Sequence, residues 1–282
     1  MSINQDWLRQ EFPDISELSP IAEGGQKWVF SGKHAKDGDV VLKICLRMHP
    51  ERIARETQAV QSIKSPRVPK ILALGTAQAN LGEVVWIREE KIFGDNLRDY
   101  LQNSPLDSRA VLRLGKHLLE ALAYAEQARI VHRDVKPENI LVDLNSDFWL
   151  LDFGLSRHLD LTSLTATASP RGVGTWGYAP PEQFRNQKSE IDSRVDLFAL
   201  GVTLYECVEG INPFRYQARD EAEVFHRIES MPLPAISKPI DAANEFKDLV
   251  FAMTRARRDH RLESAKAALE WIQEICDREG LA

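Results

Sequence analysis

The sequence predicts an α+β protein whose strands lie in its first third and whose helices fill the remainder. Short apolar or alternating runs, which are typical of strands, occur at 40–45, 71–74 and 83–87. Longer stretches with helical periodicity come later in the chain, at 107–129, 192–208, 220–229, 241–254 and 264–279. The hydrophobic content of 43% and the charged content of 28% are those of an ordinary globular protein.

The composition indicates which kinds of binding partner and which cellular compartment to expect. A chain of 282 residues can bury a sizeable core in one or two domains. Its net charge of −6 argues against a nucleic-acid partner. The three cysteines are an odd number without metal-ligand spacing, which favours a reducing, cytoplasmic compartment. The first eleven residues lack a signal-peptide core, and no apolar run approaches the roughly 18 residues that span a bilayer, so we expect no membrane partner.

The first 18 residues carry three bulky side chains, Trp7, Leu8 and Phe12, among polar residues. This pattern predicts a short helix that docks onto the body of the protein. We assign it no chemistry, because such segments most often serve packing alone.

Two features of the strand-rich part are candidates for ligand binding. Gly24 and Gly25 form a turn within 20–31, and backbone amides in such a turn can cradle phosphates. An ordinary hairpin is the alternative. Lys43 is the only charge in the strand 40–45, and a half-buried lysine needs a partner. The alternative for Lys43 is a strand lysine that faces solvent.

The segment 130–154 carries the densest set of reactive side chains. Asp134 and Asn139 lie five residues apart on a loop that Pro137 prevents from becoming a helix. Asp152 follows an apolar run that predicts a short strand. Oxygen ligands of these types can hold Mg²⁺ against phosphate oxygens. A carboxylate beside them can receive a hydroxyl proton.

These motifs carry a family resemblance. His-Arg-Asp at 132–134 with Asn139, then Asp-Phe-Gly at 152–154, resembles the H-R-D-x-x-x-x-N and D-F-G signatures of eukaryotic-type (Hanks-type) Ser/Thr protein kinases, nearest in pattern to soluble bacterial members. A Ser/Thr-rich segment that ends in Pro-Pro-Glu at 180–182 resembles their activation segment, whose usual ending is A-P-E. The resemblance covers roughly 18–276.

The resemblance implies a bilobal kinase fold, with a small β-rich N-lobe, a larger helical C-lobe and ATP in the cleft between them. The corresponding division of the chain is a docking segment at 1–18, an N-lobe at 19–92 and a C-lobe at 93–282, with the catalytic domain at 19–276. The implied cofactors are ATP and Mg²⁺, or Mn²⁺ in its place.

The resemblance also implies the catalytic roles. Asp134 orients and deprotonates the substrate hydroxyl, and Lys136 neutralises charge on the transferred phosphoryl group. Asn139 and Asp152 bind the metal ions. Thr175 hydrogen-bonds Asp134 and Lys136, which together with the position of Lys136 marks a Ser/Thr rather than a Tyr kinase. The implied partner is therefore a protein substrate with a Ser or Thr acceptor.

For the nucleotide, Lys43 is expected to hold the α- and β-phosphates and to pair with Glu56 on a helix at 50–63, with Glu51 as the second choice. Glu89 falls at the gatekeeper position, where a charge is unusual. The first and third glycines of the family loop are replaced here by other residues. The expected ATP-binding residues are Ala22, Gly24, Gly25, Lys27, Val29, Val41, Lys43, Glu90, Ile92, Asn96 and Leu141. Among them Asn96, with Asp95 as the alternative, is expected at the ribose.

Other residues that match family positions are expected to have structural roles or to select the substrate. Asp196, in an apolar helix, is expected to hold the backbone of the catalytic loop, since a buried aspartate requires hydrogen-bond partners. Arg261 is expected to pair with Glu182. Glu138 and Glu206 match positions that favour basic residues near the acceptor in some family members.

A regulatory phosphate site is a further hypothesis. Arg133 precedes the catalytic aspartate, and Arg52 and Arg157 fall where the family builds a phosphate pocket. Three converging guanidinium groups would be satisfied by a phosphate. The alternative is that these arginines lie on separate solvated faces. The candidate phosphosites, modified in trans within a transient homodimer, are Thr165, Thr167 and Ser169, of which the last two are favoured.

Two rival functions stay open at this point. A small-molecule kinase of the aminoglycoside or choline type shares the Asp-x-x-x-x-Asn spacing, but lacks the matches at His132, Lys136 and the Pro-Pro-Glu segment. A pseudokinase that serves as a scaffold module would fit the degraded glycine loop, whereas every ionic catalytic position is intact.

Overall fold

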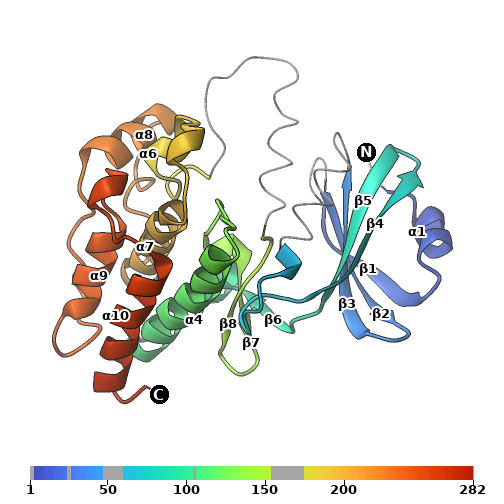
Figure 1. Ribbon diagram of the computed structural model, residues 1–282, viewed down its shortest axis with the longest axis horizontal. Coiled ribbons are helices and arrows are strands. Elements are labelled where there is room, and N and C mark those ends of the chain that lie inside the picture. The colour runs from blue at the N-terminus through green and yellow to red at the C-terminus, as the bar shows by residue number, and fades with distance from the viewer. Residues whose placement is uncertain (1–2, 24–26, 47–59, 104–105, 154–174, 282) are drawn as a thin grey trace. The chain divides into compact units, whose positions relative to one another are not determined.

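The computed structural model describes residues 3–23, 27–46, 60–103, 106–153 and 175–281. The chain forms two compact units. The first comprises residues 1–62 and 69–92, and the second comprises residues 63–68 and 93–282. A β-sheet dominates the first unit and helices dominate the second, which confirms the predicted α+β class (Figure 1).

Residues 63–68 belong to the second unit, although a division of the chain at residue 92 places them in the first. The backbone N–H of Leu150 donates to the carbonyl of Arg67 at 2.9 Å. The Arg67 guanidinium also bonds Asp147 at 2.7 Å. These contacts explain why the segment belongs to the second unit.

The first unit is built on a five-stranded antiparallel sheet in the order β1-β2-β3-β5-β4. Consecutive strands pair except where β5 inserts between β3 and β4. The predicted strands at 40–45, 71–74 and 83–87 all lie within it. The strands are β1 (Ile15–Glu23), β2 (Lys27–His34), β3 (Gly38–Leu46), β4 (Ile71–Ala79) and β5 (Gly82–Glu90).

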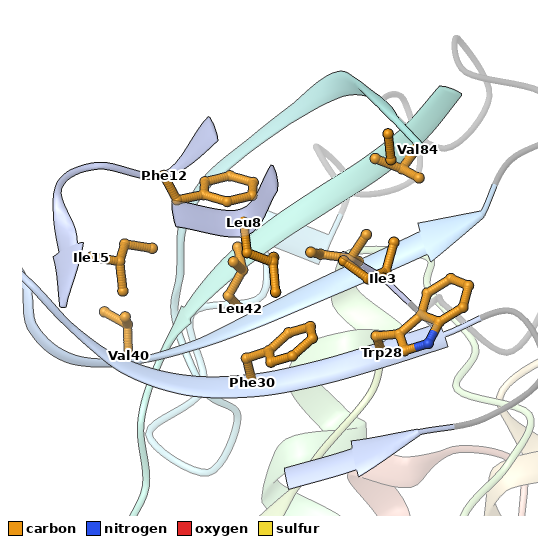
Figure 2. Packing of buried hydrophobic residues seen from close by; sticks show 11 residues of the cluster. Ile3, Leu8, Phe12, Ile15, Trp28, Phe30, Val40, Leu42 and Val84 are labelled. Carbon is orange, nitrogen blue, oxygen red and sulfur yellow. The ribbon is translucent and has the colours of Figure 1, made fainter. Parts of the chain in front are cut away.

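One face of this sheet is covered by the helix α1 (Gln5–Glu11). The Asn4 side chain caps this helix by accepting from the N–H groups of Asp6 and Trp7, at 2.7 Å and 3.3 Å. Figure 2 shows the apolar cluster between helix and sheet. The cluster includes Leu8, Phe12, Trp28, Phe30, Val40, Leu42 and Ile44. The N-terminal segment therefore forms the predicted helix and buries its bulky side chains.

The second unit combines a small sheet with a set of helices (Figure 1). Its sheet has the order β6-β7-β8, with β6 (Gly94–Asn96), β7 (Ile140–Asp143) and β8 (Phe148–Leu150). The larger helices are α3 (Leu97–Asn103), α4 (Ser108–Gln127), α7 (Arg194–Glu209), α8 (Glu221–Ser230), α9 (Glu245–Met253) and α10 (Ala265–Arg278). Short turns complete the described part, at α6 (Pro181–Phe184), η1 (Pro137–Asn139), η2 (Lys188–Glu190) and η3 (Arg258–His260).

Local sequence explains how these elements start and approach one another. Asp107 caps α4, because its carboxylate accepts from the N–H of Ala110 at 2.8 Å. Gly94 has no side chain to collide with β7, since a Cβ there would lie 2.0 Å from the Val142 carbonyl oxygen. Helix α7 is buried nearly all round, as predicted for 192–208. In the described part of the chain, none of the helices is long and apolar enough to cross a bilayer.

Candidate active site

The loop that carries the candidate catalytic residues is anchored to α7. The carboxylate of Asp196 accepts from the backbone N–H groups of His132 and Arg133, both at 2.7 Å. Burial raises the pKa of Asp196, while the nearby His132 and the two N–H bonds act in the opposite direction. Arg133 has a φ of 69°, in the left-handed region. The anchor predicted for Asp196 is thus present, and it holds the backbone in a conformation that arginine rarely adopts.

A second link joins this loop to the strand end before Asp152. The Nδ1 atom of His132 accepts from the N–H of Asp134 at 3.2 Å, so its Nε2 atom carries the proton that is donated to the carbonyl of Leu151 at 2.7 Å. The N–H of Leu151 in turn donates to the carbonyl of Asn139 at 2.9 Å. These bonds tie both motifs into one framework within the second unit.

The carboxylate of Asp134 is held by three side chains. Asn139 Nδ2 donates to Asp134 Oδ2 at 2.9 Å and to its carbonyl oxygen at 2.7 Å. The Thr175 hydroxyl donates to Asp134 Oδ1 at 2.6 Å and accepts from Lys136 Nζ at 2.6 Å. Lys136 Nζ also lies 2.8 Å from Asp134 Oδ2. The contacts that the resemblance implies for Thr175 are therefore present.

This arrangement fixes the carboxylate without sealing it. The side chains of Asp134 and Lys136 are 18% and 17% exposed. A carboxylate in such a position can receive a proton from an approaching hydroxyl, and an ammonium beside it can neutralise an incoming phosphoryl group. Sequence analysis predicts a plain loop at Pro137, whereas the structure has the short 3₁₀ turn η1 there. Proline fits its first position because no N–H is needed there.

A backbone hydrogen bond joins the two segments that carry the residues expected to bind metal. The backbone bond between Leu151 and Asn139 brings the segment of Asp152 to η1. Because the side-chain nitrogen Nδ2 of Asn139 donates to Asp134, the side-chain oxygen Oδ1 is the atom suited to a metal ligand. Asp152 adopts a φ of 64°. Among the described residues, no group of three or more His, Cys, Asp or Glu side chains is placed so that it could hold a metal ion. A carboxylate and an amide fit Mg²⁺, which keeps waters and binds phosphate oxygens as well.

In the first unit, the sheet face opposite α1 carries the nucleotide-binding candidates. Lys43 lies directly across from Val29, and Val41 lies across from Glu89. Because side chains alternate along a strand, all four share one face. Ala22 pairs with Val29 and so lies on this face too.

Lys43 forms a buried ion pair with Glu89 on this face. Only 5% of Lys43 and 8% of Glu89 is exposed. The two strands β3 and β5 supply the partners, so the pair is set by strand register. Glu56, the partner predicted for Lys43, lies outside the described residues. The sequence pattern gave no signal for Glu89 as a partner, because the order of strands in the sheet is not visible in it.

The other candidates of the nucleotide site fall in several places. Lys27 begins β2 and Glu90 ends β5, where the Glu90 N–H donates to the carbonyl of Lys70 at 3.0 Å. Ile92 follows Glu90 closely and is half-buried. Leu141 lies on β7 opposite Asn96. The candidates outside the described residues are Gly24, Gly25, Arg52, Glu56, Arg157, Thr165, Thr167 and Ser169.

Asn96, expected at the ribose, has a structural role in the second unit. Its amide donates to the Glu138 carbonyl at 2.5 Å, and its own carbonyl oxygen accepts from the N–H of Arg98 at 2.9 Å. Asn96 thus ties β6 and the start of α3 to the catalytic loop. A ribose contact stays a prediction. Arg98 itself, which sequence analysis did not select, also bonds the side chain of Glu138.

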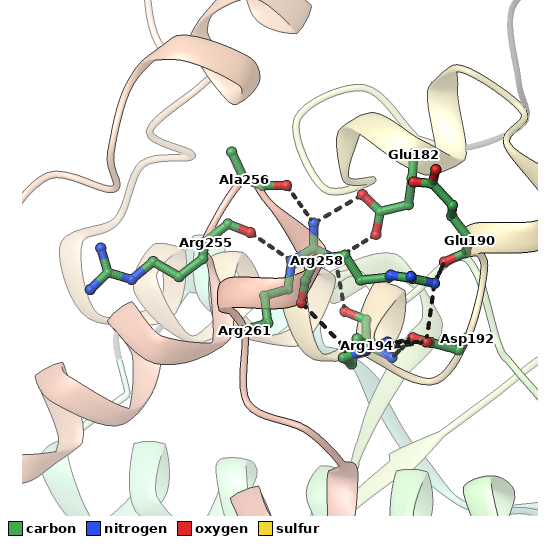
Figure 3. Close-up of polar contacts among 8 residues, drawn as sticks. All are labelled: Glu182, Glu190, Asp192, Arg194, Arg255, Ala256, Arg258 and Arg261. Carbon is green, nitrogen blue, oxygen red and sulfur yellow. Dashed lines mark hydrogen bonds and ion pairs between the residues drawn. The ribbon is translucent and has the colours of Figure 1, made fainter.

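The segment that follows Thr175 is locked by a buried ion pair. Figure 3 shows Arg261 facing Glu182, whose two oxygens accept from Nη1 and Nη2 at 2.5 Å and 2.9 Å. Three backbone carbonyls take the other bonds of the guanidinium, including that of Arg194 at 3.2 Å. The pair predicted from the resemblance is present, and neither side chain is accessible enough to touch a substrate, at 0% and 4% exposed.

Comparison with known proteins identifies the family. Residues 15–272 match the protein kinase domain. The chain therefore belongs to the protein kinase family, which confirms the resemblance to Hanks-type Ser/Thr kinases.

Curated relatives narrow the comparison. The chain is 29% identical to serine/threonine-protein kinase PknB of Mycolicibacterium smegmatis, over 91% of this chain and 42% of that protein. It is 30% identical to serine/threonine-protein kinase PrkC of Bacillus subtilis, over 76% of this chain and 32% of that protein. It is 28% identical to serine/threonine-protein kinase Aurora-2 of Arabidopsis thaliana, over 98% and 94%. The chain thus spans less than half the length of these two bacterial relatives.

Proposed function

We propose that this protein is an ATP-dependent Ser/Thr protein kinase that transfers the γ-phosphate to protein hydroxyls. The observation that carries the proposal is the constellation around Asp134, whose carboxylate is oriented by Asn139, Thr175 and Lys136. Such a carboxylate beside a cation is what phosphoryl transfer to a hydroxyl requires.

In the proposed reaction, the acceptor oxygen forms a bond to the γ-phosphorus while the bond from that phosphorus to the bridging oxygen of ADP breaks. Asp134 orients the hydroxyl and takes its proton. Lys136 stabilises charge on the transferred group. Lys43 holds the α- and β-phosphates, and Asn139 and Asp152 hold the metal. Mg²⁺, when bound, supplies charge neutralisation at the phosphate oxygens.

Two observations weigh against the rival functions. A small-molecule kinase does not need the contact between Lys136 and Thr175 or the buried pair of Glu182 and Arg261, both of which support a protein-kinase activation segment. A pseudokinase typically loses an ionic catalytic group, whereas Lys43, Asp134, Asn139 and Asp152 are retained.

We also propose control by phosphorylation of the activation segment at Thr167 or Ser169, in trans between two copies. Its support is the position of Arg133, which precedes Asp134 directly and whose backbone is held by Asp196. A phosphate bound by this guanidinium would bias the loop that positions Asp134. Mass spectrometry of active protein should find phosphate within 158–175. The hypothesis is wrong if it finds none, or if a Thr165/Thr167/Ser169 triple alanine variant and Arg133→Ala both keep full activity.

The experiment for the function itself measures transfer of labelled γ-phosphate to a degenerate peptide library with Ser and Thr acceptors, with Mg²⁺ and with Mn²⁺ in parallel. Labelled peptide with Mg²⁺ supports a Ser/Thr kinase with the proposed metal, and higher turnover with Mn²⁺ would revise the metal. Labelling of choline or an aminoglycoside but not of peptide would support the small-molecule alternative. Nucleotide binding without any transfer would support the pseudokinase.

A further inference from the structure

Arg98, the second residue of α3, gathers two acidic side chains that come from distant parts of the second unit. Its Nε donates to Glu138 Oε1 at 2.9 Å, and its Nη1 donates to Glu206 Oε1 at 2.8 Å. Its Nη2 donates to the hydroxyl of Tyr178 at 2.6 Å. The Tyr178 hydroxyl in turn donates to Glu206. We call these four residues the Arg98 cluster.

The cluster is a partly buried charge assembly. The Glu206 side chain is 9% exposed, and those of Arg98 and Glu138 are 27% and 41% exposed. Burial opposes the charge on Arg98, but the bond to Glu206 and the nearby carboxylates outweigh it and raise the pKa of Arg98. Burial and Glu206 also raise the pKa of Tyr178, which therefore stays neutral. One cation thus serves two carboxylates.

Two members of the Arg98 cluster lie close in sequence to residues that hold the Asp134 carboxylate. Glu138 directly precedes Asn139, whose amide holds the Asp134 carboxylate. Tyr178 lies three residues after Thr175, whose hydroxyl holds the other carboxylate oxygen. An extended substrate peptide advances by at most about 3.6 Å per residue. When its Ser or Thr hydroxyl lies at Asp134, the side chains on either side of that residue therefore come close to these two segments.

Two carboxylates in such a position would attract an arginine or lysine of the substrate by charge-assisted hydrogen bonds. Here that place is already taken by a guanidinium of the same chain, which donates one hydrogen bond to each carboxylate. To reach these carboxylates, a basic substrate residue would have to displace Arg98. The displaced guanidinium would then lose its bond to Glu206, whose side chain is only 9% exposed.

We propose that Arg98 is a specificity-determining residue that replaces a basic residue of the substrate, so that this kinase phosphorylates acceptor sequences without requiring arginine or lysine near the hydroxyl. The proposal rests on the proposed protein kinase function. Loss of Arg98 should convert the enzyme into one that prefers basic acceptor sequences, because the two carboxylates then lack their cation.

The test measures kcat/KM on a positional peptide library in which each position around a Ser or Thr is Arg, Lys or Gln. Wild type should prefer Arg over Gln by less than about threefold at every position. Arg98→Ala should gain a preference of about tenfold or more at one or more positions, as expected for a hydrogen-bonded charge pair. Adding Glu138→Gln to Arg98→Ala should reduce that gain. Arg109→Ala is the matched control, since it removes an exposed arginine of α4 and should leave the profile unchanged.

The outcomes separate this inference from the function on which it rests. No peptide labelling by wild type would overturn the function. Labelling by wild type, with a folded Arg98→Ala or Arg98→Leu variant that gains no basic preference, would overturn the inference alone. Should neither variant fold, wild type and Glu138→Gln decide. A strong wild-type preference for arginine that Glu138→Gln abolishes would overturn the inference, whereas equally flat profiles would support it.

Discussion

The buried pair of Lys43 and Glu89 makes the first unit sensitive to loss of a single charge. Replacing Glu89 by Gln keeps the size of the side chain and one acceptor, but leaves a lysine that is 5% exposed without its carboxylate partner on β5. At contact distance, an effective dielectric constant of about 20 gives an attraction of about 4 kcal/mol. The remaining hydrogen bond and the lower desolvation cost of Gln recover about half of it.

We therefore expect Glu89→Gln to lower the local stability of β3 and β5 by about 2 kcal/mol, and Lys43→Met to lower it by a similar amount. The double variant should be more stable than the sum of the two losses predicts, with a coupling energy of about 1.5 kcal/mol or more. Because the chain has two compact units, global unfolding need not be two-state. Hydrogen exchange of the β3 and β5 amides is the suitable assay, since it measures opening of these strands directly.

An exposed ion pair of the same unit provides the control. Arg9 and Asp6 lie 3.9 Å apart with side chains 74% and 82% exposed, so Arg9→Ala should change stability by about 0.5 kcal/mol or less. A coupling energy between Lys43 and Glu89 no larger than about 0.5 kcal/mol would refute the reasoning. It would mean that the pair contributes little to the stability of the sheet.

Three further predictions concern the second unit. Burial, assisted by the charge of Arg67, lowers the pKa of His117 from 6.5 to about 4. Between these pH values the unfolded chain binds a proton that the folded chain does not bind, so the free energy of unfolding should fall by about 3 kcal/mol as the pH drops from 6.5 to 4. Denaturant titrations of His117→Gln should not show that loss. Arg261→Met leaves the buried Glu182 carboxylate without its cation and should lower the free energy of unfolding by about 3–5 kcal/mol. Replacing both residues by Met should restore much of that stability in the same titrations. Thr175→Ala removes the bridge to Asp134 and should lower kcat up to about 100-fold in a transfer assay, with little change in KM for ATP; an unchanged kcat would contradict the bridge.

Sequence analysis recovers what depends on local pattern and on motif spacing. The helix at 192–208, with an aspartate among apolar residues, predicts a buried anchor, and Asp196 does bond the loop. The spacing of Asp134, Asn139 and Asp152 predicts one site within the second unit. The anchor is confirmed because the periodicity of one helix suffices to predict it, whereas the catalytic and metal-binding roles of Asp134, Asn139 and Asp152 stay predictions from motif spacing.

What the sequence does not reveal are contacts between elements far apart in the chain. Glu89 meets Lys43 only because β5 inserts beside β3, an order that no alternation pattern specifies. Arg98 on α3 bonds Glu206 on α7, which lies 108 residues further along the chain. Both contacts follow from tertiary arrangement, and each changes the role that sequence alone assigns to a carboxylate.

The most direct test of the central claim compares Asp134→Asn with wild type in two assays of the same protein, phosphoryl transfer to peptide and equilibrium binding of MgATP. Asparagine keeps the size of the side chain but removes the charge and the proton acceptor. We predict a loss of transfer of about 100-fold or more with nearly unchanged nucleotide affinity, because Asp134 acts on the hydroxyl. Transfer at a near-normal rate would contradict the assignment of Asp134, and with it the account of the active site.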